Sequence, residues 1–436
     1  MIELVKLTPE EHANRRKKLR RTLIIILTPL IITIIIFSAG AAYSAHTMRA
    51  HRAEIRAETR ANLLYDFTYL LYVLEHNLPT MDFLRIQQNI DLMAHGHEIL
   101  DTIYCPGWYP YFMWFWRILG SEFLGPLGDI HPTGNLRRVH EDMRRWMFLE
   151  YRRLGVANED NMFAREPEFI YHNFLISLSE MQERTEMFAN WRGTKIAYYN
   201  ISFFSARITP TRCTATQNFF RDIQDAPHLI VDIRGVSGGA TWFFDERIGR
   251  FLVAEETYAN FHNFYMGGSH NQVFFDRAGE LRPQSSAICF GYVTSLLAND
   301  YLHVLDYLAR MQYHYVYRYV LSPHDTPYTF GGKVWILVDE YTKNAAHVAA
   351  AVYKDLGIAT IVGNTTGGGG AVCSIAGTSN FVTLPNTGII VRYDTIFTLS
   401  PNGRPVEYGV EPHYFNRPGK DALETVLALI EEGWYR

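Results

Sequence analysis

Two short turns carry residues suited to hydrolytic chemistry, and each follows an apolar run typical of a buried strand. The first is 235–239, Gly-Val-Ser-Gly-Gly, after the run that begins at His228. The second is 339–343, which leads from the run 334–338 into an Ala-rich helix predicted over 344–356. The first residues of a helix have free backbone N–H groups at its positive end, which suit an oxyanion or a nucleophile. These turns are therefore the candidate functional segments.

The elements around these turns alternate between strands and helices from about residue 195 onward. Strands are predicted over 195–204, 228–235, 334–338, 359–362, 380–384 and 388–394, and helices over 216–225, 242–252, 344–356 and 421–434. Such alternation implies an α/β fold with a mostly parallel sheet. A chain of 436 residues that is 48% hydrophobic and 20% charged can bury a sizeable core and is not disordered.

The N-terminal residues have the pattern of a membrane anchor. Residues 1–22 carry seven Lys/Arg against three Glu, and the stretch 23–45 has no charged residue. A membrane-spanning helix needs about 20 such residues, and its basic flank stays in the cytoplasm. We predict a cytoplasmic tail over 1–22, a single anchor in the lipid bilayer of the cell membrane over 23–45, and an extracytoplasmic remainder. A cleaved signal peptide is the alternative, with a weak site at 42–44.

The rest of the chain is predicted to form two regions, a helical one over 46–190 and the α/β core over 191–436. A stalk helix is expected over 46–77, ending before Pro79. The aromatic run 108–116, Trp-Tyr-Pro-Tyr-Phe-Met-Trp-Phe-Trp, is either a membrane-interface patch or part of the core.

The net charge and the cysteine spacing limit the classes of ligand that the sequence favours. A net charge of −4 gives no basic bias toward nucleic acid. The four cysteines show no metal-ligand spacing and favour no disulfide pairing; they are Cys105, Cys213, Cys289 and Cys373. We therefore predict no nucleic-acid partner, no metal and no cofactor.

Five segments, taken in order, resemble one protein family. They are 65–78, YDFTYLLYVLEHNL; 228–239, HLIVDIRGVSGG; 363–370, GNTTGGGG; 384–393, LPNTGIIVRY; and 401–412, PNGRPVEYGVEP. Over roughly residues 60–436 the chain resembles the tail-specific (C-terminal-processing) serine proteases, in the branch related to the tricorn core and the retinoid-binding-protein modules. It contains no segment that resembles the PDZ module found in many relatives.

The resemblance implies a crotonase-like spiral α/β core and a serine peptidase that acts on peptides or protein ends. It places the nucleophile at Asn344, where the family usually has Ser. It also places the oxyanion and substrate-binding groups at Gly238, Gly239 and Ala345.

The family activates its serine with a Lys or with a His-containing tetrad. The Lys variant would place Lys at Gly369, so it is absent here. For the tetrad, His131 in the turn 128–134 is the best match, and His95 and His97 are poorer ones. Glu407 is the candidate for the supporting carboxylate.

Asn344 changes what such a site can do, because a carboxamide is not a useful nucleophile at neutral pH. The nearby hydroxyls of Tyr341 and Thr342 are expected to point elsewhere. Asparagine is instead a good N-cap for the predicted helix. A site with an oxyanion cradle and no nucleophile could bind a peptide carbonyl or carboxylate without cutting, so the protein is a candidate pseudoenzyme and non-catalytic scaffold.

A third hypothesis uses Ser237. The turn 235–239 fits Gly-x-Ser-x-Gly between a strand and a helix, the context of an esterase-like nucleophile elbow. Asp339 and His413 could complete such a triad. An active peptidase, a peptide-binding relative and this esterase-like hydrolase therefore remain as three possible functions.

The predicted topology can be tested with protease added to intact spheroplasts that carry the protein. We expect residues 46–436 to be digested without lysis, because the uncharged stretch 23–45 leaves them outside the cytoplasm. A large domain that is protected until the membrane is broken would contradict this topology.

Overall fold

The structure is a computed structural model that describes residues 9–103, 115, 118–123, 137–138, 185–204, 210–236, 238, 242–278, 284–285, 294–295, 297, 299–369, 372, 379–387 and 390–433. The chain divides into two compact units. The first comprises residues 1–62 and 104–111, and the second comprises residues 63–103 and 112–436.

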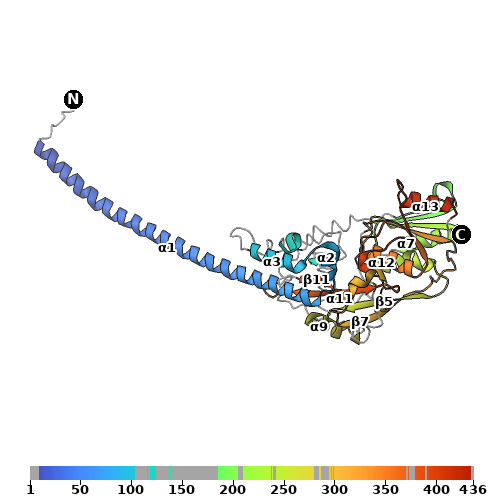
Figure 1. The fold of residues 1–436 in the computed structure, drawn as a ribbon. Helices are drawn as coiled ribbons and strands as arrows, with labels where there is room; N and C mark the ends of the chain where they lie inside the picture. Colours follow the sequence, from blue (N-terminus) through green and yellow to red (C-terminus); the bar gives the residue numbers. More distant parts are fainter. Residues whose placement is uncertain are drawn as a thin grey trace, which may run out of the picture. The chain divides into compact units, whose positions relative to one another are not determined.

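Helix α1, Pro9–Asn77, runs through the first unit and into the second (Figure 1). It contains the whole of the predicted stalk and ends just before Pro79. Among the described residues, no helix is both long and apolar enough to cross a membrane. Most side chains of the predicted anchor, 23–45, lie outside the described residues, so the anchor stays a prediction.

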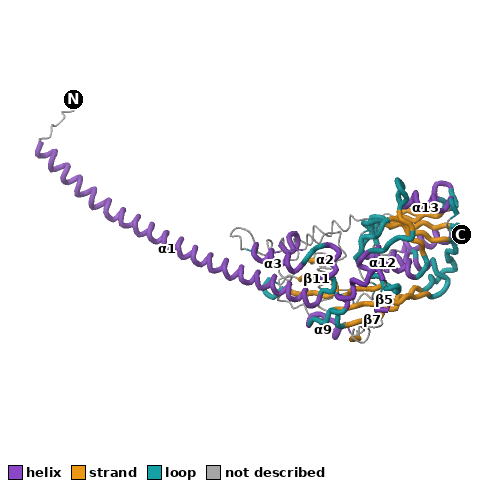
Figure 2. Tube along the Cα trace, viewed as in Figure 1, coloured by secondary structure: helices purple, strands orange, loops and turns teal. Residues whose placement is uncertain are grey.

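The second unit is built on a six-stranded sheet in the order β13-β9-β8-β4-β3-β2. Strands are drawn in orange in Figure 2. The strands are β2 (Thr185–Phe188), β3 (Ile196–Ile201), β4 (His228–Asp232), β8 (Lys333–Val338), β9 (Ala359–Gly363) and β13 (Tyr414–Phe415). All neighbours pair in parallel except β2, which is antiparallel to β3. The predicted α/β class with a mostly parallel sheet is thus confirmed.

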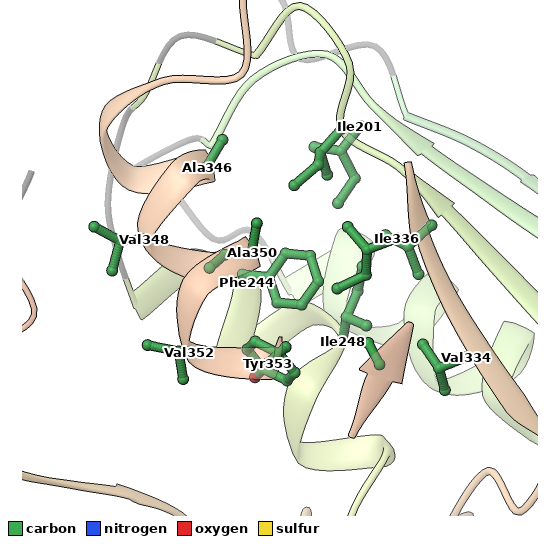
Figure 3. Close-up of a cluster of buried hydrophobic side chains, with 14 of the residues drawn as sticks. Ile201, Phe244, Ile248, Val334, Ile336, Ala346, Val348, Ala350, Val352 and Tyr353 are labelled. Atoms are coloured by element: carbon green, nitrogen blue, oxygen red, sulfur yellow. The ribbon is translucent and has the colours of Figure 1, made fainter. Parts of the chain in front are cut away.

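Helices cover both faces of this sheet, because alternate side chains of its buried strands point to opposite sides. Leu229 and Val334 face the cluster that contains α7 (Pro210–Asp222), α8 (Trp242–Arg247) and α12 (Asn344–Asp355); Figure 3 shows part of it. Ile230 and Trp335 face α13 (Ala422–Glu431) on the other side. The start of α13 is fixed by a capping box between Asp421 and Glu424.

Two antiparallel sheets complete the unit. The first has the order β12-β5-β7-β6, with β5 (Thr257–Tyr265), β6 (Gln284–Ser285), β7 (Tyr313–Leu321) and β12 (Ile396–Leu399). The second has the order β1-β11-β10, with β1 (Arg137–Arg138), β10 (Ser379–Thr383) and β11 (Ile390–Asp394). Strands β1 and β2 fall within 46–190, which was expected to be helical.

The remaining described helices are short. They are α2 (Met81–Gln88), α3 (Leu92–Thr102), a π-helix (Ile118–Phe123), α9 (Ser269–Ala278), α11 (Leu305–Leu308) and 3₁₀ turns at Trp191–Gly193, Gly249–Phe251, Asn299–Val304 and Val406–Tyr408. The single helix predicted over 242–252 is wrong in one respect: Ile248, with φ −134°, breaks it into α8 and a 3₁₀ turn. Within the aromatic run 108–116, Phe115 is described and is fully buried.

The end of α1 is fastened to the core by a buried carboxylate. Leu63 and Phe67 pack in one cluster with residues of β10 and β11. Between them, Asp66 is fully buried and accepts hydrogen bonds from the turn that precedes β11. The donors are the backbone N–H and side-chain amide of Asn386, both at 2.9 Å, and the backbone N–H and hydroxyl of Thr387, both at 2.7 Å. One side chain thus fixes the register of α1 against this turn.

Replacing Asp66 with Ala should lower the free energy of unfolding by about 3 kcal/mol or more, because four donors lose their acceptor inside the core. Urea unfolding measures this directly. Glu75→Ala, at an exposed position on the same helix, should change stability by less than about 0.5 kcal/mol. Equal effects of the two substitutions would show that the buried carboxylate does not stabilise the helix.

Candidate active site

The turn between β8 and α12 is tied to the turn after β4 by one carboxylate. Asp339 Oδ1 accepts hydrogen bonds from the backbone N–H of Gly235 at 2.9 Å and of Tyr341 at 3.1 Å. Thr342 Oγ1 lies 3.0 Å from the same oxygen and 3.2 Å from the carbonyl oxygen of Ile233. The two candidate functional segments are therefore held side by side.

Asn344 lies at the first position of α12, beside Gly238. A methyl group on Gly238 would lie 3.1 Å from Asn344 Cβ and 3.5 Å from its side-chain nitrogen. The backbone N–H of Asn344 donates to Gly368 at 3.0 Å, and that of Lys343 donates to Val236 at 2.9 Å. Position 344 is thus enclosed between the glycine turn after β4 and the glycine loop after β9.

The backbone of Asn344 is left-handed, with φ 50°. The N-cap of α12 is Lys343, which is extended and makes no side-chain capping bond, so the N-cap role predicted for Asn344 is wrong. Left-handed residues other than glycine cost about 1 kcal/mol or more, and they gather at functional turns. A strained residue between a strand and a helix is the geometry that presents the nucleophile in α/β-hydrolases.

The loop 364–369 contacts the start of α12 and the turn that leads into it. The backbone N–H of Gly367 donates to the carbonyl of Thr342 at 3.0 Å. A methyl group on Gly367 would clash with the carbonyl oxygen of Glu340 and would lie 2.7 Å from Lys343 Cγ. Only glycine fits this approach, which explains part of the glycine run that the sequence shows.

His347, one turn into α12, is hydrogen-bonded to this loop. It is fully buried, and its Nδ1 lies 2.7 Å from the hydroxyl of Thr366. That hydroxyl accepts the backbone N–H of Val410 at 2.7 Å, so its own hydrogen is free to go to the histidine. Nδ1 is then the acceptor and the ring hydrogen is on Nε2. Burial lowers the pKa of His347 to about 4, so the ring is neutral at pH 7.

Glu407 lies in the buried 3₁₀ turn just before Val410. It is 1% exposed, and its Oε1 accepts the backbone N–H of Thr398 at 2.9 Å. Burial, aided by the nearby charge of Asp394, raises the pKa of Glu407 to about 8. The carboxyl group is therefore mostly protonated at neutral pH. In this form it can donate a hydrogen bond but does not act as a base.

Several residues predicted for the site lie outside the described residues: Ser237, Gly239 and His131. Strand β1, six residues after His131, pairs with β11, with Arg137 opposite Arg392. Gly238 and Ala345 are described, and Ala345 is 4% exposed on the buried side of α12.

The other candidate side chains are engaged elsewhere. His97 is exposed on α3, and its Nδ1 lies 2.7 Å from the carbonyl oxygen of Met93. His95, on the same helix, stacks on Phe123. Tyr341 is 60% exposed, whereas the hydroxyl of the fully buried Thr342 is used in the turn.

The triad suggested for Ser237 gains no support from the described contacts. The Asp339 carboxylate is occupied by the turn described above. His413 bonds instead to β9, where its Nδ1 accepts the backbone N–H of Ile361 at 2.9 Å. Among the residues that the structure describes, no group of three or more His, Cys, Asp or Glu side chains could hold a metal ion.

Sequence reasoning missed the group that joins α8 to α12. Asp245 accepts a hydrogen bond from Tyr353 at 2.7 Å and another from Tyr319 on β7. Burial raises the pKa of Asp245 and of Tyr353. The contact of the Tyr353 hydroxyl with Gly249 leaves no room for a side chain there. No local signal identifies this group, because its members come from three separate elements.

Comparisons with known proteins found a family model and solved structures that are similar to this chain. Residues 195–415 match the family model described as peptidase family S41. No curated protein matches the chain. Among solved structures, a putative peptidase from Parabacteroides merdae ATCC 43184 is similar, with TM-score 0.50, 17% identity, and coverage of 84% of this chain and 96% of that one.

Two further structures are less similar. Mature CPAF has TM-score 0.47 and 14% identity, with coverage of 82% of this chain and 92% of that chain. A lipoprotein from Streptococcus agalactiae has TM-score 0.43 and 12% identity, with coverage of 85% and 96%.

Glu407 should make stability fall as the pH rises. Its pKa is about 8 in the folded protein and near 4.5 when exposed, so between these values the folded state holds a proton that the unfolded state has lost. Ionisation of Glu407 should lower the free energy of unfolding by about 2 kcal/mol between pH 6.5 and pH 8. This pH window lies above the range in which His347 titrates, so the two groups can be distinguished.

Glu407→Gln keeps the acceptor for Thr398 and cannot ionise, so it should flatten this slope in urea unfolding measured across the window. Glu411→Gln, at a half-exposed position four residues on, is the matched control and should leave the slope unchanged. An unaltered slope in the Glu407 variant would mean that this carboxyl ionises normally.

Proposed function

Since this chain belongs to peptidase family S41, we propose that it binds peptides or protein ends beside Asn344 and hydrolyses them poorly or not at all. The family's activity is hydrolysis by a serine peptidase, and the proposal concerns what this chain retains of it. We also propose that the core has the crotonase-like spiral of the family. We further propose that a membrane anchor holds the core outside the cytoplasm, where it acts.

One observation carries this proposal: Asn344 occupies a strained, left-handed position at the start of α12, against Gly238. The backbone has the shape that would present a nucleophile, and the side chain is a carboxamide that cannot serve as one. Backbone N–H groups near this point can still hold a carbonyl or carboxylate oxygen. Binding without efficient cleavage is the chemistry that remains.

The nearby groups also favour binding over catalysis. The hydroxyl of Thr342 is buried and engaged with Asp339. His347 is buried, and its unprotonated nitrogen Nδ1 is occupied by the hydroxyl of Thr366, so it supports the loop and is not free to act as a base. The protonated carboxyl of Glu407 lacks the charge that would orient and stabilise a catalytic imidazolium.

A fluorophosphonate probe distinguishes the candidate functions. No labelling of the native protein is expected if it is a peptide-binding relative. Labelling at Ser237 would instead indicate the esterase-like hydrolase, and labelling at another serine would indicate an active peptidase with a different nucleophile.

Asn344→Ser should restore measurable peptide cleavage. Loss of a triad nucleophile costs about 10⁶-fold in kcat, and a general base supplies about 10²–10⁴ of the rate. A serine without a confirmed base should therefore gain on the order of 10²-fold or more, measured as hydrolysis of a fluorogenic peptide library.

Two variants control this experiment. Asn218→Ser adds a serine at an exposed position of α7 and should leave the rate at background. Asn344→Ala should bind peptides as the native protein does, because the cradle is backbone. Strong peptidase activity of the native protein that survives Asn344→Ala would overturn the proposal.

A further inference from the structure

Helix α1 changes abruptly where it enters the core. From Leu63 onward it is packed, with Leu63 only 1% exposed and Phe67 fully buried. Before that point every residue from 46 to 58 is exposed, so over several turns no side of the helix is covered by another part of the described chain. We call residues 46–62 the exposed segment, which ends at the boundary between the two compact units.

The charges of the exposed segment do not support its helix. Ion pairs on a helix need opposite charges three or four residues apart. The segment has four arginines, none with an acidic residue at that spacing: Arg49, Arg52, Arg56 and Arg60. Arg52 and Arg56 are instead four residues apart, as are Glu54 and Glu58, so like charges repel. An ion pair between His51 and Glu54, at 4.0 Å, is highly exposed and contributes little.

The helix of the exposed segment should therefore open more easily than the core. Most helical stability in proteins comes from tertiary packing rather than from propensity. A polar helix with no packed face and no favourable pairs at this spacing is only marginally stable. Opening cannot readily spread past Leu63, because the buried carboxylate of Asp66 fixes the next turn to the core. We expect local unfolding of this segment while the second unit stays folded.

Each arginine of the exposed segment is followed by an alanine. The Arg-Ala pairs are at 49–50, 52–53, 56–57 and 60–61. A charged group in the specificity pocket of a protease selects the side chain before the cleaved bond, and a carboxylate there selects a positive one. Alanine after that bond brings neither a ring nor a large side chain. The segment has no Lys, Leu or aromatic residue, so arginine is the feature by which a protease would recognise it.

We propose that the exposed segment is a processing site for a protease that cleaves after arginine, and that the cut releases the folded core. The cut hydrolyses one Arg–Ala peptide bond. The C–N bond breaks, the hydroxyl of water goes to the arginine carbonyl carbon to form a carboxyl group, and the remaining proton goes to the alanine nitrogen, which becomes an amine. Where the proposed membrane anchor holds the chain, the same cut detaches the core from the membrane. The cleavage itself requires neither the anchor nor peptide binding beside Asn344.

Limited digestion of the full chain with trypsin in detergent, followed by sequencing of the new amino termini, tests the site. Termini that begin at the alanine after each arginine of the exposed segment should appear at least about tenfold faster than termini from cuts after Arg85 and Arg310. The side chains of these two arginines are 60% and 55% exposed, but they lie in the folded second unit. Equal rates at the two kinds of site, or no cut in the exposed segment, would overturn the proposal.

Variants of the exposed segment test whether arginine is the recognised residue. Replacing all four arginines with Gln, which has a similar helix propensity, should abolish the cut in this segment. Replacing all four with Lys keeps the charge that trypsin recognises and should preserve the cut. Arg85→Gln is the matched control and should leave the cut unchanged. Cleavage of the segment that survives the Gln variant, or a Lys variant that resists trypsin, would overturn the role of the arginines.

Hydrogen exchange measures the opening without a protease. In the native protein the backbone amides of 49–61 should exchange at least about a hundredfold faster than those of 66–74, which lie in the packed part of the same helix. Equal protection of the two ranges would show that the exposed segment is held closed and would overturn the proposal.

Spheroplasts that carry the full chain test the release. Added trypsin should move the core from the membrane to the supernatant, and the variant with four Gln should stay on the membrane. A core that is cut in the exposed segment and yet stays on the membrane would overturn the release.

Discussion

The carboxylate of Asp339 is the interaction on which the candidate site depends. It joins the turn after β8 to the backbone N–H of Gly235 in the turn after β4. These turns follow neighbouring parallel strands, so they begin at the same edge of the sheet. The backbone bond from Lys343 to Val236 joins the same two turns, and together with the Asp339 bridge it fixes the distance between them. Asn344 and Gly238 are thereby held in contact.

The parts of the fold that could be predicted are those with a strong local cause. Strands β4 and β8 are continuous apolar runs because both of their faces are buried. The Ala-rich sequence of α12 and the capping box of α13 are also local features that indicate a helix. Strands β5 and β7 lie in the range 253–332, where no element was predicted. Their aromatic and histidine residues do not alternate cleanly with polar ones, so the period of two is hidden.

The candidate site was harder to predict because its electrostatics arise from burial between distant segments. The sequence contains Glu407 in a recognisable motif, but its protonation depends on the low polarity of the core around β12. The link from His347 to Thr366 and Val410 joins three segments that no spacing rule relates. The left-handed backbone of Asn344 follows from the close approach of two loops and has no signature in its own neighbours.

The backbone at position 344 also bears on why asparagine is there. Asparagine is one of the few residues other than glycine that visit left-handed φ routinely, since its short amide can bond locally, whereas serine gains less there. Exchanging a serine for asparagine at such a turn would relieve strain while it removed a nucleophile. Strained sites are commonly kept at the expense of stability when activity requires them. Under the proposed function, selection for a stable fold would alone be enough to retain Asn344.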